Sequence, residues 1–408
     1  MKKINIILAG LISGLIVVAC GGGSSPAPAA TTPAAAVTSN TYIGAGSVWD
    51  VSINSDATFT IKHQLTAALP IDMTILGTYT RLTPTGYLLL TVTSSTGTSA
   101  AQPNPGDQAY ALEVPGYAFL LAPISATDDQ IVAMVSAGAC PSTTADLNWV
   151  AVKSGLAPNI ATNEFFGSAS YTPAAGSGGA SGNVGLGINY ALTAGFPVAN
   201  NAGAPMAGTC TAGVIHFPFQ VTNGVAAGSA TATGQPDNYF YVTAAGGGIL
   251  HSDFSQVPAA APTTGVDHIF FAVPVEVGTA VASLAGTYSG MVFDNTRATG
   301  NKTDFVKVTC DPLGQCIGTQ INPTTDVSTP GSGVLISINA ANSPSNGFFT
   351  GTIDGYNTTT LAVAGTPGNI ACAIDTNANG GTKNVINCTG QSPNGIGTSM
   401  FNVLLTQR

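Results

Sequence analysis

Short alternating segments separated by turn residues are the feature that most constrains how this chain can fold. Val48 to Ile53 and Thr58 to His63 each alternate apolar and polar residues, and Asn54-Ser55-Asp56 separates them. Period-two runs rich in Val, Ile, Thr, Tyr and Phe, spaced by Gly, Pro, Asn and Asp, are typical of antiparallel strands. The sequence therefore predicts an all-β chain with little helix, in which antiparallel strands form two or three barrel-like or sandwich-like modules.

The same pattern continues to the end of the chain. Eight or nine sequential strands joined by short turns follow residue 283, and they most economically close into an up-and-down barrel, with a sandwich as the alternative. The predicted strands include Ala212 to Val221, Ala226 to Thr233, Thr359 to Val363 and Ile370 to Asp375.

The first twenty residues direct the chain out of the cytoplasm. Lys2 and Lys3 precede an uncharged apolar run from Ile4 to Ala19, which ends on a small residue just before Cys20. A basic start, an apolar run and a small residue before the cleavage point form a secretory signal peptide. A transmembrane helix needs about 20 apolar residues, and this run is shorter. Its ending, Val-Val-Ala-Cys, resembles the lipobox of bacterial lipoproteins.

The resemblance implies how the mature chain is held. In that family the cysteine is lipidated, the signal is cleaved just before it, and the new amino terminus is acylated. It thus implies a signal peptide at 1–19, fatty acid such as palmitate on Cys20, and the lipid bilayer as a partner. Two or more acyl chains anchor a protein stably. Gly21 is not the aspartate-type retention signal of enteric bacteria, which favours the cell outer membrane.

Residues 20–40 are predicted to be a flexible linker. After Cys20 they carry no charge, no aromatic residue and no periodicity, and twenty such residues would span roughly 25 Å. The Gly-rich sequence after the cysteine resembles that of surface lipoproteins of the transferrin-binding and factor-H-binding kind. That resemblance implies no binding residues here.

The charge of the chain excludes nucleic acid as a partner. Without the signal peptide, 8 basic residues stand against 19 acidic ones, whereas phosphate binding needs clustered Lys and Arg. Charged residues make up 7% of the chain, and no Lys or Arg occurs between Lys153 and Arg297. Hydrophobic residues make up 44%, which is enough to fill a core and argues against a disordered chain.

Cysteine spacing defines two β-hairpins in the last third of the chain. Cys310 and Cys316 flank Asp-Pro-Leu-Gly, a type I turn sequence. Cys372 and Cys388 are equidistant from Gly380, where a three-residue loop would place them directly opposite each other. Opposed residues in a non-hydrogen-bonded pair come close enough for a disulfide. We expect both pairs to be bonded.

The remaining cysteines bear on the domain organisation. The six cysteines after Cys20 are an even number in a chain that enters an oxidising compartment, so by elimination Cys140 pairs with Cys210. That bond would tie the first segment to the middle one. We therefore expect a β region at 41–278, either as one unit or as two modules near 41–157 and 158–278, and a C-terminal β module at 279–408.

No catalytic or metal-binding motif is present, and we expect no cofactor and no metal. HExxH, GxSxG, CxxC and Walker sequences are absent. Asp375-Thr376-Asn377-Ala378-Asn379-Gly380 fits the first half of a calcium loop, but Ile386 stands where a bidentate Glu is needed, so we interpret the phrase as a turn. Four histidines could serve a hydrolase and four aromatic residues could stack on sugars, although strand aromatics more often belong to a core. They are His63, His216, His251, His268, Trp49, Trp149, Tyr239 and Tyr241.

These patterns lead to two functional hypotheses. The first is a non-enzymatic outer-membrane lipoprotein with a β-rich ectodomain, surface-exposed or facing the periplasm, that binds an unknown extracellular or envelope ligand or serves as a structural envelope component. The alternative is an anchored hydrolase that acts on a polymer or glycan. A histidine in a cleft beside a serine or two carboxylates would favour the hydrolase, and scattered histidines would favour binding.

Overall fold

Strands make up nearly all the regular structure of the chain in the computed structural model. The contacts of Thr38–Arg408 form one compact unit. None of the helices in the described residues is long and apolar enough to cross a membrane. The signal peptide, Cys20 and the linker up to residue 37 lie outside the described residues. The structure describes residues 38–44, 49–64, 70–99, 102–123, 132–136, 138–153, 166–191, 198–201, 205–218, 220–222, 225–227, 237–243, 246–253, 268–294, 303–339, 346–378, 383–391 and 400–408.

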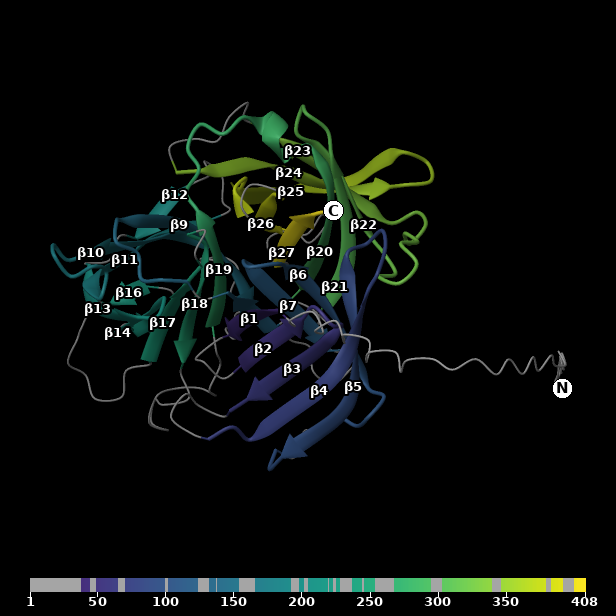
Figure 1. Cartoon of the computed structure of the whole chain (residues 1–408). Helices are drawn as coiled ribbons and strands as arrows, with labels where there is room; N and C mark the ends of the chain where they lie inside the picture. The colour runs from purple at the N-terminus through teal and green to yellow at the C-terminus, as the bar shows by residue number, and fades with distance from the viewer. Residues whose placement is uncertain are drawn as a thin grey trace, which may run out of the picture. The chain divides into compact units, whose positions relative to one another are not determined.

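The first eight strands form a closed antiparallel barrel, in which β8 pairs with β1 (Figure 1). Alternate side chains of each strand point inward, as the period-two pattern predicts. Phe59 and Ile61, for example, are both buried in the apolar cluster that fills the barrel. The strands are β1 Ser39–Gly44, β2 Trp49–Asn54, β3 Thr58–His63, β4 Met73–Arg81, β5 Tyr87–Gly97, β6 Gln108–Val114, β7 Ala118–Pro123 and β8 Val132–Val135.

The middle of the chain forms a nine-stranded sheet in the order β10-β9-β19-β18-β17-β14-β13-β11-β12. Because β10 also pairs with β11, the sheet curls back on itself and β12 is attached at the outer edge of β11. A separate hairpin joins β15 and β16. The strands are β9 Ala145–Lys153, β10 Phe166–Pro173, β11 Ser181–Ala191, β12 Val198–Asn201, β13 Met206–Thr211, β14 Val214–Pro218, β15 Gln220–Thr222, β16 Val225–Ala227, β17 Asp237–Val242, β18 Gly248–Asp253 and β19 His268–Pro274.

The last eight strands form the second closed barrel, in which β20 pairs with β27. This is the up-and-down barrel that the run of short, sequential strands predicts. A 3-10 turn, η2 Val281–Leu284, precedes it. The strands are β20 Gly286–Asp294, β21 Thr303–Cys310, β22 Gln315–Gln320, β23 Gly333–Ile338, β24 Phe348–Asn357, β25 Ala362–Asp375, β26 Val385–Gln391 and β27 Met400–Gln407.

The three sheets share one buried apolar cluster. It includes Tyr117 from the first barrel, Phe271 from β19 and Phe348 from β24, each with no exposed surface. The ring of Tyr117 lies 6.1 Å from that of Phe271, and the Asn387 amide of β26 donates a 2.9 Å hydrogen bond to the Phe271 carbonyl. Burial and hydrogen bonding of this kind explain why the contacts of the whole folded chain form one unit.

Three disulfides join the pairs that the sequence predicts: Cys140–Cys210, Cys310–Cys316 and Cys372–Cys388. The last two pairs lie directly opposite each other in their hairpins. The loop expected around Gly380 is longer than three residues, however, since β25 ends at Asp375 and β26 begins at Val385.

Two predicted boundaries of the modules do not match the sheets. Ser39 and Asn40, assigned to the linker, belong to β1, because they extend the ladder with β2. The alternative boundary near residue 157 would place β9, which ends at Lys153, in the first module. β9 instead pairs with β10 and β19 of the middle sheet. The described sheets therefore divide after β8. The boundary near residue 279 falls in the connection between β19 and β20.

Some predicted strands are also wrong. Residues 212–221 do not form one strand, because Ala212 and Gly213 have φ of 51° and 80° and turn the chain from β13 into β14. The segment predicted at 226–233 begins in the short strand β16, and its remainder from residue 228 lies outside the described residues. The two strands expected at 359–363 and 370–375 are one, since residues 365–367 bulge opposite Asp354 and the β24–β25 ladder resumes beyond them.

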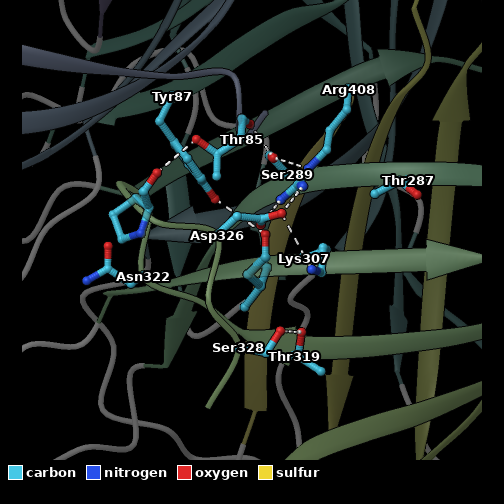
Figure 2. A network of polar contacts seen from close by, with 12 residues as sticks. Thr85, Tyr87, Thr287, Ser289, Lys307, Thr319, Asn322, Asp326, Ser328 and Arg408 are labelled. Atoms are coloured by element: carbon cyan, nitrogen blue, oxygen red, sulfur yellow. Dashed lines mark hydrogen bonds and ion pairs between the residues drawn. The ribbon is translucent and has the colours of Figure 1, made fainter. Parts of the chain in front are cut away.

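A polar network links the β4–β5 connection to the second barrel (Figure 2). Ser289 donates a hydrogen bond to the Thr85 carbonyl and accepts one of 2.9 Å from Nε of Arg408. The other two guanidinium nitrogens of Arg408 donate to the Asp326 carboxylate at 2.9 and 2.8 Å. Tyr87, fully buried, donates to a main-chain carbonyl of β20 at 2.6 Å. The hydrogen bonds and charge of Arg408 lower the pKa of Asp326 below its ordinary value.

We expect Asp326→Asn to lower the free energy of unfolding by about 1.5 kcal/mol at neutral pH, as for loss of a charged hydrogen bond. A carboxyl whose pKa is lowered in the folded state stabilises it above its unfolded pKa, and this stabilisation is lost as pH falls through the lowered pKa. Urea unfolding should therefore separate the two proteins at pH 7 and bring them together near pH 2. Asp146→Asn, at an exposed position of β9, is the control. A difference that persists at low pH would contradict the assignment.

Candidate functional site

A recess at one end of the first barrel is the first candidate site, and we call it the mouth pocket. It has a volume of about 180 Å³ and lies where β1 and β3 end and β2 begins. Its lining combines an indole, an imidazole, both signs of charge, an amide and two aliphatic side chains. The lining residues are Ile43, Trp49, Asp50, Lys62, His63, Gln64 and Ile71.

The imidazole of His63 is held from two sides. Its Nδ1 lies 2.7 Å from Oδ1 of Asp72, and its ring lies 4.5 Å from that of Trp49, the residue opposite it in the β2–β3 ladder. Asp72 is itself fixed, because its main-chain N–H donates to the His63 carbonyl and its carbonyl accepts from Thr98 and Ser99. Gly97 permits this close approach, since a Cβ there would collide with the Asp72 carbonyl. The pocket is therefore preorganised.

A buried carboxylate lies toward the opposite end of this barrel. Glu113 at the end of β6 accepts hydrogen bonds from Tyr42 at 2.7 Å and from Asn40 at 3.1 Å, and its other oxygen accepts one of 2.6 Å from Arg81. Its side chain is 1% exposed. Burial and the neighbouring carboxylate raise the pKa of Tyr42 above its ordinary value, so its hydroxyl keeps the proton that it donates. A buried, hydrogen-bonded carboxylate and the recess thus lie toward different ends of the barrel.

A second recess lies on the middle sheet, and we call it the sheet groove. It has a volume of about 440 Å³ and crosses β11, β13 and β14 next to the turn after β10. Small side chains and neutral hydrogen-bonding groups line it. The lining residues are Ala174, Ser181, Gly182, Asn183, Ala207, Gly208, Thr209 and His216.

Of the four aromatic residues considered for sugar stacking, two belong to the core and two lie in or beside the recesses. Trp149 is 5% exposed and Tyr241 is fully buried, and both belong to the shared core. Trp49 is half-buried in the mouth pocket. Tyr239 is half-buried, and its ring lies 5.0 Å from that of His216 beside the sheet groove.

The histidines lie on two sheets, His63 on the first barrel and the other three on the middle sheet. His63 lies in the mouth pocket, 2.7 Å from the Asp72 carboxylate, whereas exposed His216 lies in the sheet groove. His251 and His268 are in β18 and β19, and their side chains lie outside the described part. No serine, threonine or cysteine is among the described residues of the mouth pocket.

The calcium-like phrase is not arranged for a cation. The Asp375 side chain has no exposed surface, and one oxygen accepts a 2.8 Å hydrogen bond from the Asn377 N–H. Burial raises the pKa of Asp375, which disfavours the charged form that a metal needs. Residues 379–382 of the turn lie outside the described residues. No group of three His, Cys, Asp or Glu side chains that could hold a metal occurs among the residues that are described.

Sequence reasoning missed most of the residues of both recesses. One signal was available: Trp49 and His63 are equidistant from Asp56, so the hairpin arithmetic applied to the cysteines would have paired them. No such signal exists for Asp72, which approaches His63 through a loop. His216 and Tyr239 also pair across a long connection, which spacing alone does not align.

No family model and no curated protein matches the sequence. Among solved structures, the chain is similar to two mutant forms of transferrin binding protein B from Haemophilus parasuis Hp5, at 10% and 9% identity and a TM-score of 0.26. It is also similar to isotype 1 transferrin binding protein B from serogroup B Neisseria meningitidis, at 12% identity and a TM-score of 0.24. Each match covers 88% of this chain and 65% of the other. Scores this low assign neither a function nor a ligand here.

Proposed function

We propose that this protein is an outer-membrane lipoprotein that is anchored through acylated Cys20 and binds a ligand with its β-rich ectodomain. The observation that carries the binding role is the mouth pocket, where Asp72 and Trp49 hold the His63 ring in one orientation within a recess of about 180 Å³. A preorganised surface loses less conformational entropy when a ligand binds. The anchor is supported by the lipobox-like sequence that ends at Cys20.

The lining of the mouth pocket indicates the class of ligand. Trp49 and Ile71 supply apolar surface, and Ile71 is 50% exposed, while His63, Asp50 and Lys62 supply donors and acceptors of both charges. Sites with an apolar surface and a few placed polar groups orient small polar molecules. The volume limits the ligand to about the size of an amino acid or a monosaccharide, or to one end of a larger molecule.

The fluorescence of Trp49 tests this site. The chain has two tryptophans, so in a Trp149→Phe protein all tryptophan emission comes from the mouth pocket. Titration with amino acids, monosaccharides and nucleosides should produce a saturable change for at least one class, and the same ligand should raise the Tm of the unmodified protein. His63→Ala should abolish both effects, and His216→Ala should leave them intact. Failure of all three classes would contradict a binding role for this pocket.

The anchor has its own test. Cys20→Ser removes the thiol whose lipidation the lipobox resemblance implies, so we expect it to shift the protein completely from the membrane fraction to the soluble fraction. Ser24→Ala is the control and should remain with the membrane. Proteinase K treatment of intact cells then separates a surface-exposed ectodomain, which is degraded, from one that faces the periplasm. Membrane fractionation that is unchanged by Cys20→Ser would refute the anchor.

A hydrolase that acts on a polymer or glycan is the second candidate function, and one observation favours it. His63 of the mouth pocket contacts the Asp72 carboxylate, so an imidazole and a carboxylate lie together at one solvent-open place. Such groups could transfer protons during hydrolysis. If the protein is a hydrolase, it should cleave peptidoglycan or a neutral polysaccharide, and His63→Ala should abolish that cleavage. If the intact protein cleaves neither, a hydrolase function is excluded for those substrates.

A further inference from the structure

A row of side chains crosses four neighbouring strands of the middle sheet at one register position. Ser181 of β11 pairs with Thr209 of β13, Thr209 pairs with His216 of β14, and His216 pairs with Tyr239 of β17. Directly paired residues project from the same face of a sheet. With strands about 4.8 Å apart, the row is about 14 Å long, and its first three members line the sheet groove.

The side chains of this row and its neighbour Asn183 offer hydrogen-bonding groups and aromatic rings rather than carboxylate, ammonium or guanidinium groups. Ser181, Thr209 and Asn183 are exposed, and each can both donate and accept hydrogen bonds. His216 and Tyr239 add an aromatic surface, with rings 5.0 Å apart and inclined by 31°. Ala207 lies on the same face of β13 as Thr209 and is exposed, and its small side chain lets a ligand approach the sheet. A flat ligand rich in hydroxyl groups fits this combination.

Charge excludes an acidic ligand. No Lys or Arg occurs between Lys153 and Arg297, so no strand from β10 to β19 carries an ammonium or guanidinium group. Phosphate, sulfate and carboxylate groups are recognised mainly through Arg and Lys. None of the described residues that line the groove is Asp or Glu either, whereas most glycoside hydrolases use a pair of these carboxylates.

The strands beneath the groove also disfavour an extended peptide. A peptide that adds a strand needs a free sheet edge. β13 pairs with β11 and β14, and β14 pairs with β13 and β17, so the main-chain groups there already form ladders. Recognition must come from side chains, as it does for a sugar that lies on a sheet face.

We propose that the sheet groove is a binding site for a neutral oligosaccharide, in which the rings of His216 and Tyr239 contact sugar faces and Ser181, Asn183 and Thr209 hydrogen-bond to hydroxyl groups. This site lies on a different sheet from the mouth pocket and does not depend on the function assigned to that pocket. It binds the sugar without cleaving it.

Isothermal titration of the intact ectodomain with maltotriose, cellotriose and chitotriose tests the proposal, with trigalacturonate as the acidic comparison. At least one neutral trisaccharide should bind and trigalacturonate should not. His216→Ala should weaken binding about tenfold and Thr209→Val about fivefold, as expected for lost ring contact and a lost hydrogen bond. Both positions are exposed, so Tm should change little.

Two variants serve as controls. Thr309→Val removes an exposed strand threonine from the second barrel, and Trp49→Ala alters only the mouth pocket, so both should leave trisaccharide binding unchanged. The proposal is overturned if none of the three neutral trisaccharides binds, if trigalacturonate binds as tightly as they do, or if affinity is insensitive to both His216→Ala and Thr209→Val. Binding that is lost with Trp49→Ala instead would assign the sugar to the mouth pocket.

Discussion

A protein without the Cys140–Cys210 disulfide is expected to lose about 4 kcal/mol of unfolding free energy. The bond joins the connection before β9 to β13 across a sequence separation of 70 residues. In the chain-entropy model, closing so long a loop removes more freedom from the unfolded chain than closing a short one. Replacing both cysteines by serine therefore raises the entropy of the unfolded state. Because Cys210 is 5% exposed, its replacement by serine also buries a hydroxyl group.

The short disulfide of the second barrel provides the matched comparison. Cys310 and Cys316 are separated by 6 residues, so the same model assigns their bond only about 2 kcal/mol. Urea unfolding followed by the emission of Trp149, which lies in β9 of the affected sheet, should rank the double variants in that order. Equal losses, or a larger loss from Cys310→Ser with Cys316→Ser, would show that chain entropy does not dominate here.

Removal of the Glu113 carboxylate has the second largest expected effect. Glu113→Ala leaves the fully buried hydroxyl of Tyr42 without its acceptor and releases Asn40 and Arg81. Breaking a buried, hydrogen-bonded charge cluster costs about 3 kcal/mol. The loss matters for the barrel because β1, β4 and β6 are not neighbours in it, so the carboxylate ties together strands that no ladder joins.

Variants of the partners show how the stabilisation is distributed. The Arg81 side chain is 46% exposed, so water screens its charge and Arg81→Met should cost only about 1 kcal/mol. Glu113→Gln keeps the side-chain volume but presents an amide nitrogen to one of the donors. Its loss of unfolding free energy should therefore lie between those of Glu113→Ala and Arg81→Met. Thermal unfolding monitored by circular dichroism measures all three. A loss from Glu113→Ala no larger than that from Arg81→Met would contradict a central role for the carboxylate.

The sequence predicts the parts of this fold that depend on local pairing. The Cys310–Cys316 and Cys372–Cys388 registers follow from distances to a turn. The up-and-down order of the second barrel follows from alternation and short connections, although the strands expected at 359–363 and 370–375 are one. The positive φ of Ala212 could not be predicted, because alanine rarely adopts it. The two recesses also escaped prediction, since they depend on which distant strands become neighbours when a sheet closes. Asp72 beside His63 and Tyr239 beside His216 are the clearest examples.

The central claim is that fatty acid at Cys20 attaches a β-sheet binding protein to the membrane. Intact-mass spectrometry of the protein extracted from native membranes measures this directly. We expect a chain that begins at Cys20 and exceeds its polypeptide mass by a thiol-linked lipid and an amide-linked acyl chain. A chain that begins at Met1, or one that begins at Cys20 with no added mass, would contradict it.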